Sequence, residues 1–187
     1  MDSKTQKLAS LIRKLSYHEG DFVLSSGQKS SLYIDLKATT LHPDGAALIA
    51  EVACDLILEK EMQLDGVGGL TLGADPLATA LSLEARKRGL FWPAFIVRKE
   101  PKGHGTARYI EGSENLKAGA RVLVLEDVVT TGASSLRAIE RLRDSGFSPV
   151  AALTVVDREQ QGRISIESSG VKFLKLLTIS EVRAAET

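Results

Sequence analysis

From residue 45 to the end of the chain, short apolar runs alternate with longer segments in which apolar positions recur at helical spacing. This alternation is typical of a parallel sheet whose strands are connected by helices. The short runs are apolar at successive positions, as expected of strands buried on both faces. They comprise residues 95–97, 122–125 and 151–156. We therefore predict an α/β fold with an open, mostly parallel sheet flanked by helices.

Three helices are predicted around these strands. The first takes Asp44 as its N-cap and has an apolar face with positions spaced three and four residues apart. That face comprises Ile49, Val52, Ala53, Leu56 and Ile57. The second takes Asp75 as its N-cap and Pro76 as its first residue, and ends at Gly89. The third spans residues 133 to about 146.

Composition narrows the class of protein. The chain has 187 residues, a length typical of one domain, and 43% hydrophobic with 26% charged residues exclude a disordered or collagen-like chain. The 24 basic and 24 acidic residues give zero net charge, which disfavours a general nucleic-acid or membrane-surface binder. Cys54 is the only cysteine, so no intrachain disulfide can form. Without an apolar leader or spanning run, we expect a cytoplasmic protein.

The most informative motif is residues 122–134, where a buried strand ends in Glu126 and Asp127 before a turn of small and hydroxyl residues. Ligands of open α/β sheets bind at the carboxyl ends of strands. Backbone N–H groups of residues 130–134 at the start of a helix can surround a phosphate. The two carboxylates can accept hydrogen bonds from sugar hydroxyls, with a hard cation such as magnesium nearby. One ligand that offers both groups is a ribose 5-phosphate.

Competing phosphate motifs are absent from the sequence. Neither G-x-x-x-x-G-K-[ST] nor G-x-G-x-x-G occurs, which disfavours a kinase or a classical dinucleotide enzyme. Two adjacent acids alone would be explained more simply as a solvated strand end followed by a helix cap. The thirteen residues taken together favour the ligand site.

Two further groups suit this chemistry. Residues 98–121 form a long connection that contains the basic run 101–105, and loops of this length tend to be functional or disordered. Surface solvation is the alternative for such a run. Arg158 follows another predicted strand, where its guanidinium can bind a carboxylate or ring carbonyl. Alternatively, Asp157 simply holds Arg158 in place.

Residues 122–134 resemble the PRPP-binding signature of the type I phosphoribosyltransferases, which transfer ribose 5-phosphate from 5-phosphoribosyl 1-diphosphate (PRPP) to a base. A narrower resemblance to the orotate phosphoribosyltransferase family rests on residues 22–27 leading to Ser30, Tyr33 and Asp35, on residues 98–105 and on residues 156–160. It implies a single domain of residues 1–187, with residues 1–40 forming an N-terminal hood. It also implies that orotate and PRPP give orotidine 5′-monophosphate and pyrophosphate, in pyrimidine biosynthesis.

The resemblance assigns roles to individual residues. Lys102, His104 and Asp127 would be catalytic, while Thr130 and Arg158 would bind orotate. The PRPP-binding set would be Arg98, Lys99, Lys102, His104, Glu126, Asp127, Val128, Val129, Thr130, Thr131, Gly132, Ala133 and Ser134. Magnesium would be the cofactor, carried by PRPP near Glu126 and Asp127 without a direct protein ligand. The chain would form a homodimer in which the basic loop acts in trans, without nucleic-acid or membrane partners.

The chain departs from many relatives at two positions. Ser25 and Gly73 stand where many relatives carry lysines that contact substrate. The departure predicts a lower affinity, a compensating cation such as Lys29, or a different way of holding pyrophosphate. Two other functions remain open: transfer to a purine or uracil, and a PRPP-sensing regulator without turnover. The basic run and the lack of a DNA-binding domain disfavour the regulator.

Overall fold

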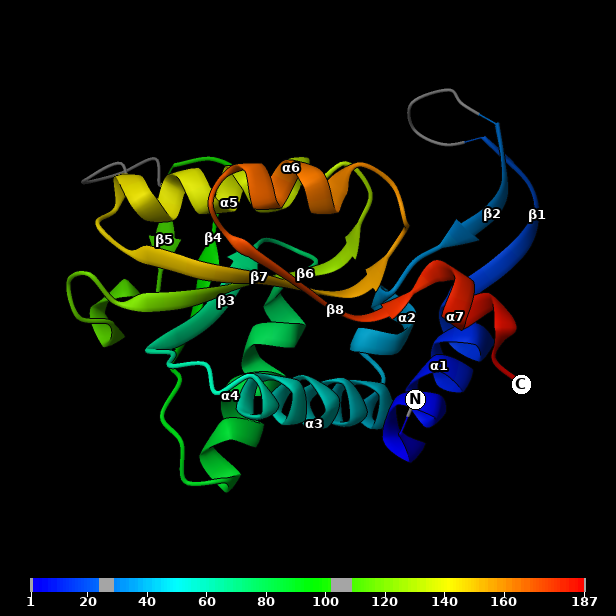
Figure 1. Ribbon diagram of the computed structural model, residues 1–187, viewed down its shortest axis with the longest axis horizontal. Coiled ribbons are helices and arrows are strands. Elements are labelled where there is room, and N and C mark those ends of the chain that lie inside the picture. The colour runs from blue at the N-terminus through cyan, green and yellow to red at the C-terminus, as the bar shows by residue number, and fades with distance from the viewer. Residues whose placement is uncertain (1, 24–28, 102–108, 187) are drawn as a thin grey trace.

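The computed structural model describes residues 2–23, 29–101 and 109–186. Its centre is a six-stranded sheet of order β5-β4-β3-β6-β7-β8 (Figure 1). All neighbours pair in parallel except β5, which runs antiparallel to β4. The strands are β3 (Gly66–Leu70), β4 (Ala94–Val97), β5 (Ile110–Glu111), β6 (Arg121–Val129), β7 (Ser148–Asp157) and β8 (Lys172–Thr178). The predicted mostly parallel sheet is confirmed.

Helices cover both faces of this sheet (Figure 1). Leu123 and Leu125 of β6 pack in one apolar cluster with α3 and α4, whereas Val122 and Val124 pack in a second cluster with α5 and α6. Because neighbouring side chains of a strand point to opposite faces, a strand buried on both faces must be apolar throughout. The helices are α3 (Pro43–Glu59), α4 (Asp75–Lys87), α5 (Ala133–Asp144) and α6 (Gly162–Ser168).

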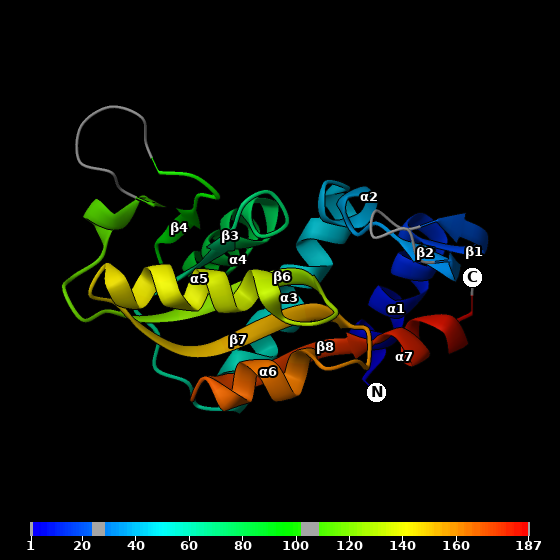
Figure 2. The same cartoon turned by 90° about the horizontal axis from the view of Figure 1, so that it is seen from above.

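The N-terminal region forms a separate layer at one end of the molecule (Figure 2). Strands β1 and β2 pair with each other in an antiparallel hairpin and form no ladder with the main sheet within the described residues. Helix α1 packs against α3 and against α7 from the C-terminus. These elements are α1 (Ser3–Ser16), β1 (Tyr17–Val23), β2 (Lys29–Ile34), α2 (Lys37–Thr40) and α7 (Ile179–Ala184). Outside this layer, a short 3-10 helix between β5 and β6 spans Ser113–Asn115.

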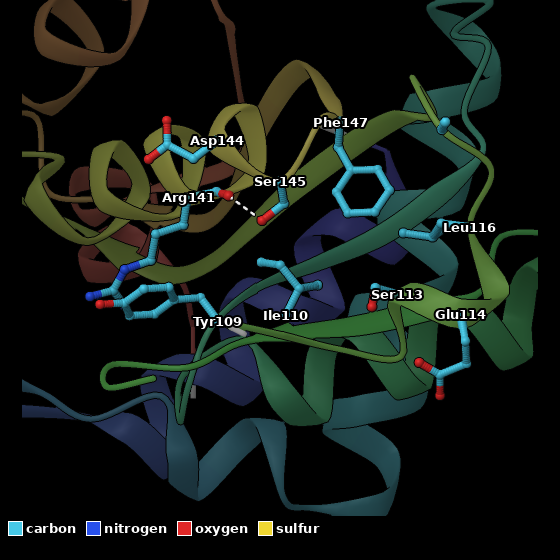
Figure 3. A pocket seen from close by; sticks show the side chains of 10 residues that line it. Tyr109, Ile110, Ser113, Glu114, Leu116, Arg141, Asp144, Ser145 and Phe147 are labelled. Atoms are coloured by element: carbon cyan, nitrogen blue, oxygen red, sulfur yellow. Dashed lines mark hydrogen bonds between the residues drawn. The ribbon is translucent and has the colours of Figure 1, made fainter. Parts of the chain in front are cut away.

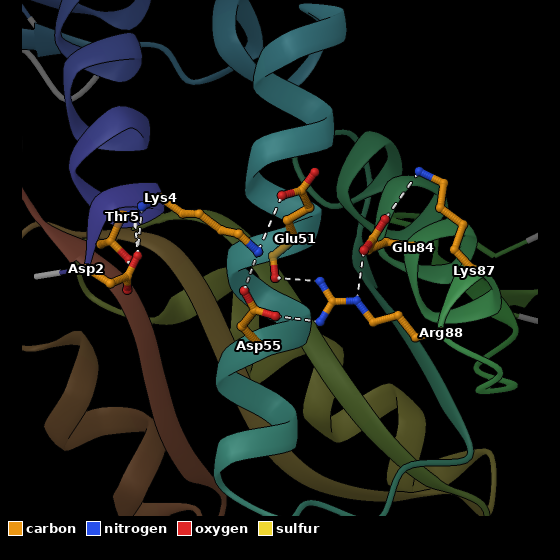
Figure 4. A network of polar contacts seen from close by, with 8 residues as sticks. All are labelled: Asp2, Lys4, Thr5, Glu51, Asp55, Glu84, Lys87 and Arg88. Atoms are coloured by element: carbon orange, nitrogen blue, oxygen red, sulfur yellow. Dashed lines mark hydrogen bonds and ion pairs between the residues drawn. The ribbon is translucent and has the colours of Figure 1, made fainter.

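Charged side chains join α1 to α3 and α4 along one surface (Figure 4). Lys4 lies 2.9 Å from the carboxylate of Asp55, and Arg88 pairs with both Asp55 and Glu84. Exposed ion pairs contribute little individually. The buried apolar face of α1 therefore supplies most of the attachment, and the charges orient the helix.

Two predicted helix starts are wrong by one or two residues. Helix α3 begins at Pro43 with His42 as its N-cap, so Asp44 lies in the first turn, where its charge favours the helix dipole. Helix α4 begins at Asp75 with Ala74 as its N-cap. The Asp75 carboxylate accepts a 2.7 Å hydrogen bond from the Thr71 hydroxyl instead of capping the helix.

Gly162, the first residue of α6, packs tightly against the end of β6. A Cβ there would overlap a Val129 methyl group and lie 2.8 Å from the Thr130 carbonyl oxygen. Gly162→Ala should therefore lower the free energy of unfolding by about 2–3 kcal/mol. Urea denaturation measures the change, with the exposed Ser168→Ala on the same helix as control. A loss no larger than that of the control would contradict this packing.

Candidate active site

The paired carboxylates lie near the carboxyl end of β6, as the sequence predicts. Ser135 Oγ donates a 3.2 Å hydrogen bond to Glu126 Oε2, and the Val128 N–H donates a 2.9 Å bond to Asp127 Oδ1. Burial, followed by the nearby charge of Asp127, raises the pKa of Glu126 to about 8. Burial also raises the pKa of Asp127, against the opposing charge of Lys37. The pair is thus poised to gain negative charge when a cationic or hydrogen-bonding ligand arrives.

The turn after the carboxylates surrounds a cavity of about 50 Å³ lined by Glu126 and by residues 128–135. Gly132 has a φ of 82°, a left-handed conformation that favours glycine, and α5 begins at the next residue. The first turn of a helix leaves N–H groups without intrahelical partners, so this cavity suits a phosphate. A 2.8 Å hydrogen bond from the Gly162 N–H to the Thr130 carbonyl fixes the turn.

Arg158 lies beside this turn at the end of the neighbouring strand. Val129 is the register partner of Asp157, and the Arg158 N–H donates a 2.9 Å hydrogen bond to the Val129 carbonyl. Burial lowers the pKa of its guanidinium, which has no hydrogen bond or ion pair with the described residues. Asp157 instead accepts a 2.9 Å bond from the Glu159 N–H. An unpaired, partly buried guanidinium favours an anionic or carbonyl ligand.

The connection that contains the basic run, residues 98–121, begins directly after β4. Arg98 pairs with Glu111 at 3.0 Å, and the charge of Lys99 acts on Glu126, where it lowers the pKa. The predicted catalytic residues Lys102 and His104 lie outside the described residues, as does Ser25.

Two neighbours of Asp127 were not expected from the sequence. A Cβ built on Gly73 would lie only 2.6 Å from Asp127 Oδ1, so the glycine backbone packs directly against the carboxylate. Lys37, paired with Asp35 at 2.6 Å, supplies positive charge to the same carboxylate. Its proximity to Asp127 carries no sequence signal, because the two residues are ninety positions apart.

The acidic pair suits a cation that arrives with its ligand. The described residues contain no cluster of three or more His, Cys, Asp or Glu side chains able to hold a metal. Two carboxylates provide fewer oxygen ligands than a magnesium or calcium ion requires. They suit a magnesium ion that would be held mainly by the oxygens of its substrate and would lie near this pair.

The raised pKa of Glu126 makes stability depend on pH. An unfolded chain loses this proton near 4.5 and the folded protein near 8. Between these values the folded state binds more protons, so its stability falls as pH rises, by about 2–4 kcal/mol from this group. Urea denaturation at pH 5 and pH 8.5 should show a smaller fall for Glu126→Gln than for the exposed Glu140→Gln control. Equal falls in the two variants would contradict the shift.

In the central sheet, β6 leads through an acidic pair into a turn of residues 130–134 that suits a phosphate, which we call the phosphate-binding turn. This arrangement in a mostly parallel sheet defines the class of the type I phosphoribosyltransferases. No family model matches the chain. The orotate phosphoribosyltransferase of a Nostoc species is 49% identical over 178 residues, covering 95% of this chain and 84% of the relative. The chain belongs to the orotate phosphoribosyltransferase family.

Solved structures agree with this membership. A structure of the Mycobacterium tuberculosis orotate phosphoribosyltransferase gives a TM-score of 0.84 at 40% identity, covering 96% of this chain and 98% of the other. A second structure of that enzyme, in complex with PRPP, gives a TM-score of 0.80 at 38% identity, covering 96% of this chain and 99% of the other.

No helix within the described ranges is long and apolar enough to cross a membrane.

Proposed function

We propose that the enzyme forms orotidine 5′-monophosphate and pyrophosphate from orotate and PRPP at the carboxyl edge of β6 and β7. The observation that carries this is the partly buried guanidinium of Arg158, which pairs with none of the described residues, in a chain 49% identical to an orotate phosphoribosyltransferase. The backbone of Arg158 adjoins the end of β6, next to the phosphate-binding turn. The solved relative bound to PRPP supports the same substrate here.

PRPP lies along the turn in this proposal. The N–H groups of residues 130–134 bind its 5′-phosphate, and Glu126 and Asp127 accept hydrogen bonds from its ribose hydroxyls. When bound with PRPP, magnesium neutralises oxygen charge on the substrate. Glu126 and Asp127 lie where they would face this ion.

The base and the leaving group occupy opposite sides of the sugar C1 atom. Arg158 binds the orotate carboxylate or a ring carbonyl, and Thr130 contacts the same base. The C1–O bond breaks with its electron pair going to pyrophosphate, and orotate N1 forms the new C1–N bond and loses its proton to water. Arg98, Lys99, Lys102 and His104 stabilise the charge that develops on pyrophosphate. No residue is assigned as the general base.

We also propose that the protein is a cytoplasmic homodimer in which each basic loop completes the partner's site. If so, mixing the inactive Lys102→Ala and Asp127→Asn variants should restore about a quarter of wild-type activity. Half of randomly mixed dimers would contain one site with an intact Asp127 and an intact Lys102. Reconstitution after dissociation, followed by an activity assay, tests this. No recovery despite exchange of subunits would contradict action in trans.

A spectrophotometric assay tests the reaction itself. Purified protein with orotate, PRPP and magnesium should consume the orotate absorption band and release nucleotide and pyrophosphate. Adenine, hypoxanthine and uracil serve as alternative bases in parallel reactions. Turnover with one of these but not with orotate would contradict the base assignment. A PRPP-induced thermal shift without turnover on any base would favour the PRPP-sensing regulator.

A further inference from the structure

Arg141, near the C-terminal end of α5, joins both ends of the segment that contains the basic run. Its guanidinium donates one hydrogen bond to the Arg98 carbonyl through Nη1 and a 2.7 Å bond to the Lys99 carbonyl through Nη2. On the other side, its Cζ lies 4.2 Å from the centre of the Tyr109 ring (Figure 3). One side chain therefore contacts residues that precede and follow the basic run.

The two ends are also fixed to each other. The Arg98 N–H donates a 2.8 Å hydrogen bond to the Tyr109 carbonyl, and Val97 pairs with Ile110 in the β4–β5 ladder. The Arg98 guanidinium reaches Glu111 on the returning strand. These contacts hold the two ends of the segment together. We call the four residues Arg98, Lys99, Tyr109 and Arg141 the clamp.

The side chain of Arg141 forms the contacts of the clamp rather than a surface ion pair. It lies beside a cavity of about 580 Å³ that Glu114 and Asp144 also line (Figure 3). Within the described residues it pairs with neither carboxylate. A planar guanidinium can donate two hydrogen bonds in a fork and stack on a ring at once, which a lysine ammonium cannot do.

Helix α5 connects the clamp to the phosphate-binding turn. The helix begins directly after Gly132, and Ser135 in its first turn donates a hydrogen bond to Glu126. Ala138, Ile139 and Leu142 bury the helix against the sheet. Because a packed helix is rigid at this length, the position of Arg141 relative to the turn is fixed.

We infer that Arg141 is a positioning residue. It sets the backbone of Arg98 and Lys99 at a fixed distance from the phosphate-binding turn. This inference rests on the proposed function, in which those two residues bind the pyrophosphate of PRPP. Small displacements of groups that contact the leaving group reduce rate strongly. Loss of Arg141 should therefore weaken the use of PRPP and spare the binding of orotate at Arg158.

Kinetics with matched variants test this role. Arg141→Ala should raise KM for PRPP or lower kcat/KM for PRPP by about tenfold or more, with KM for orotate changed less than about twofold. Arg141→Lys should recover only part of the loss, since it keeps the charge without the fork. Tyr109→Phe should behave as wild type, because the ring face remains. The control is Arg143→Ala, which removes a guanidinium on the same helix that bonds the Ser169 carbonyl at 2.8 Å.

Hydrogen–deuterium exchange provides a readout that does not need turnover. Amides of residues 96–100 and 109–111 should lose protection in Arg141→Ala and keep it in Arg143→Ala. Unchanged protection, or lost protection with unaltered kinetics for PRPP, would overturn the inference. A wild-type protein that neither turns over nor binds magnesium–PRPP in calorimetry would instead overturn the proposed function, while the exchange result would still report whether Arg141 holds the clamp.

Discussion

Replacing Asp127 by asparagine should reduce kcat/KM for PRPP by about a thousandfold while the protein stays folded. The amide keeps the shape of the side chain but loses the charge that, in the proposed function, accepts hydrogen bonds from the ribose and would face magnesium. Since burial disfavours the charged carboxylate, its removal should not lower the unfolding midpoint. Steady-state kinetics at varied PRPP, together with thermal unfolding, measure both effects.

The exposed Asp144→Asn, at the far end of α5, makes the same chemical change away from the turn. It should retain wild-type kinetics. Asp127→Asn kinetics within twofold of this control would remove Asp127 from the reaction. A large loss of activity accompanied by unfolding would mean that the carboxylate has a structural role instead.

Gly73→Ala should lower kcat/KM for PRPP by about a hundredfold, because the new methyl group must displace the Asp127 carboxylate. That carboxylate is largely buried and accepts a hydrogen bond from the Val128 N–H. A displacement would break this bond and move the carboxylate away from its position in the site. Lysine at position 73 should be no better than alanine, since it introduces the same Cβ. Kinetics of both variants test this.

Gly89→Ala is the matched control. Gly89 has a φ of 79° in the turn after α4, and a Cβ there would meet no atom within 4 Å. This change should cost about 1 kcal/mol of stability and leave kcat/KM unchanged. Full activity of Gly73→Ala would show that Asp127 tolerates displacement, contrary to the geometry.

The sheet could be predicted from sequence because its strands carry local signals. Residues 122–125 are apolar at every position and residues 151–156 at every position except Thr154, a pattern typical of strands buried on both faces. The starts of α3 and α4 were less predictable. Asp44 and Asp75 are good capping residues, yet Pro43 extends α3 backwards and Thr71 engages Asp75.

The same distinction applies to the site. The carboxylates and the phosphate-binding turn are contiguous in sequence, so one motif predicted their arrangement. The contact of Gly73 with Asp127, and those of Arg141 with the backbone of Arg98 and Lys99, depend on which strands become neighbours. Pairing of β3 with both β4 and β6 decides these contacts, and strand order leaves no mark on any single segment.

The high pKa of Glu126 has a consequence for how a charged ligand approaches. Below about pH 8 this carboxyl group is a neutral acid until a ligand binds. An incoming polyanion such as PRPP therefore meets less like-charge repulsion than two ionised carboxylates would present. In the proposed reaction, the second negative charge would develop only once magnesium is carried in with the substrate, and the displaced proton would leave to solvent. The acidic pair thus admits an anion first and becomes a strong cation partner afterwards.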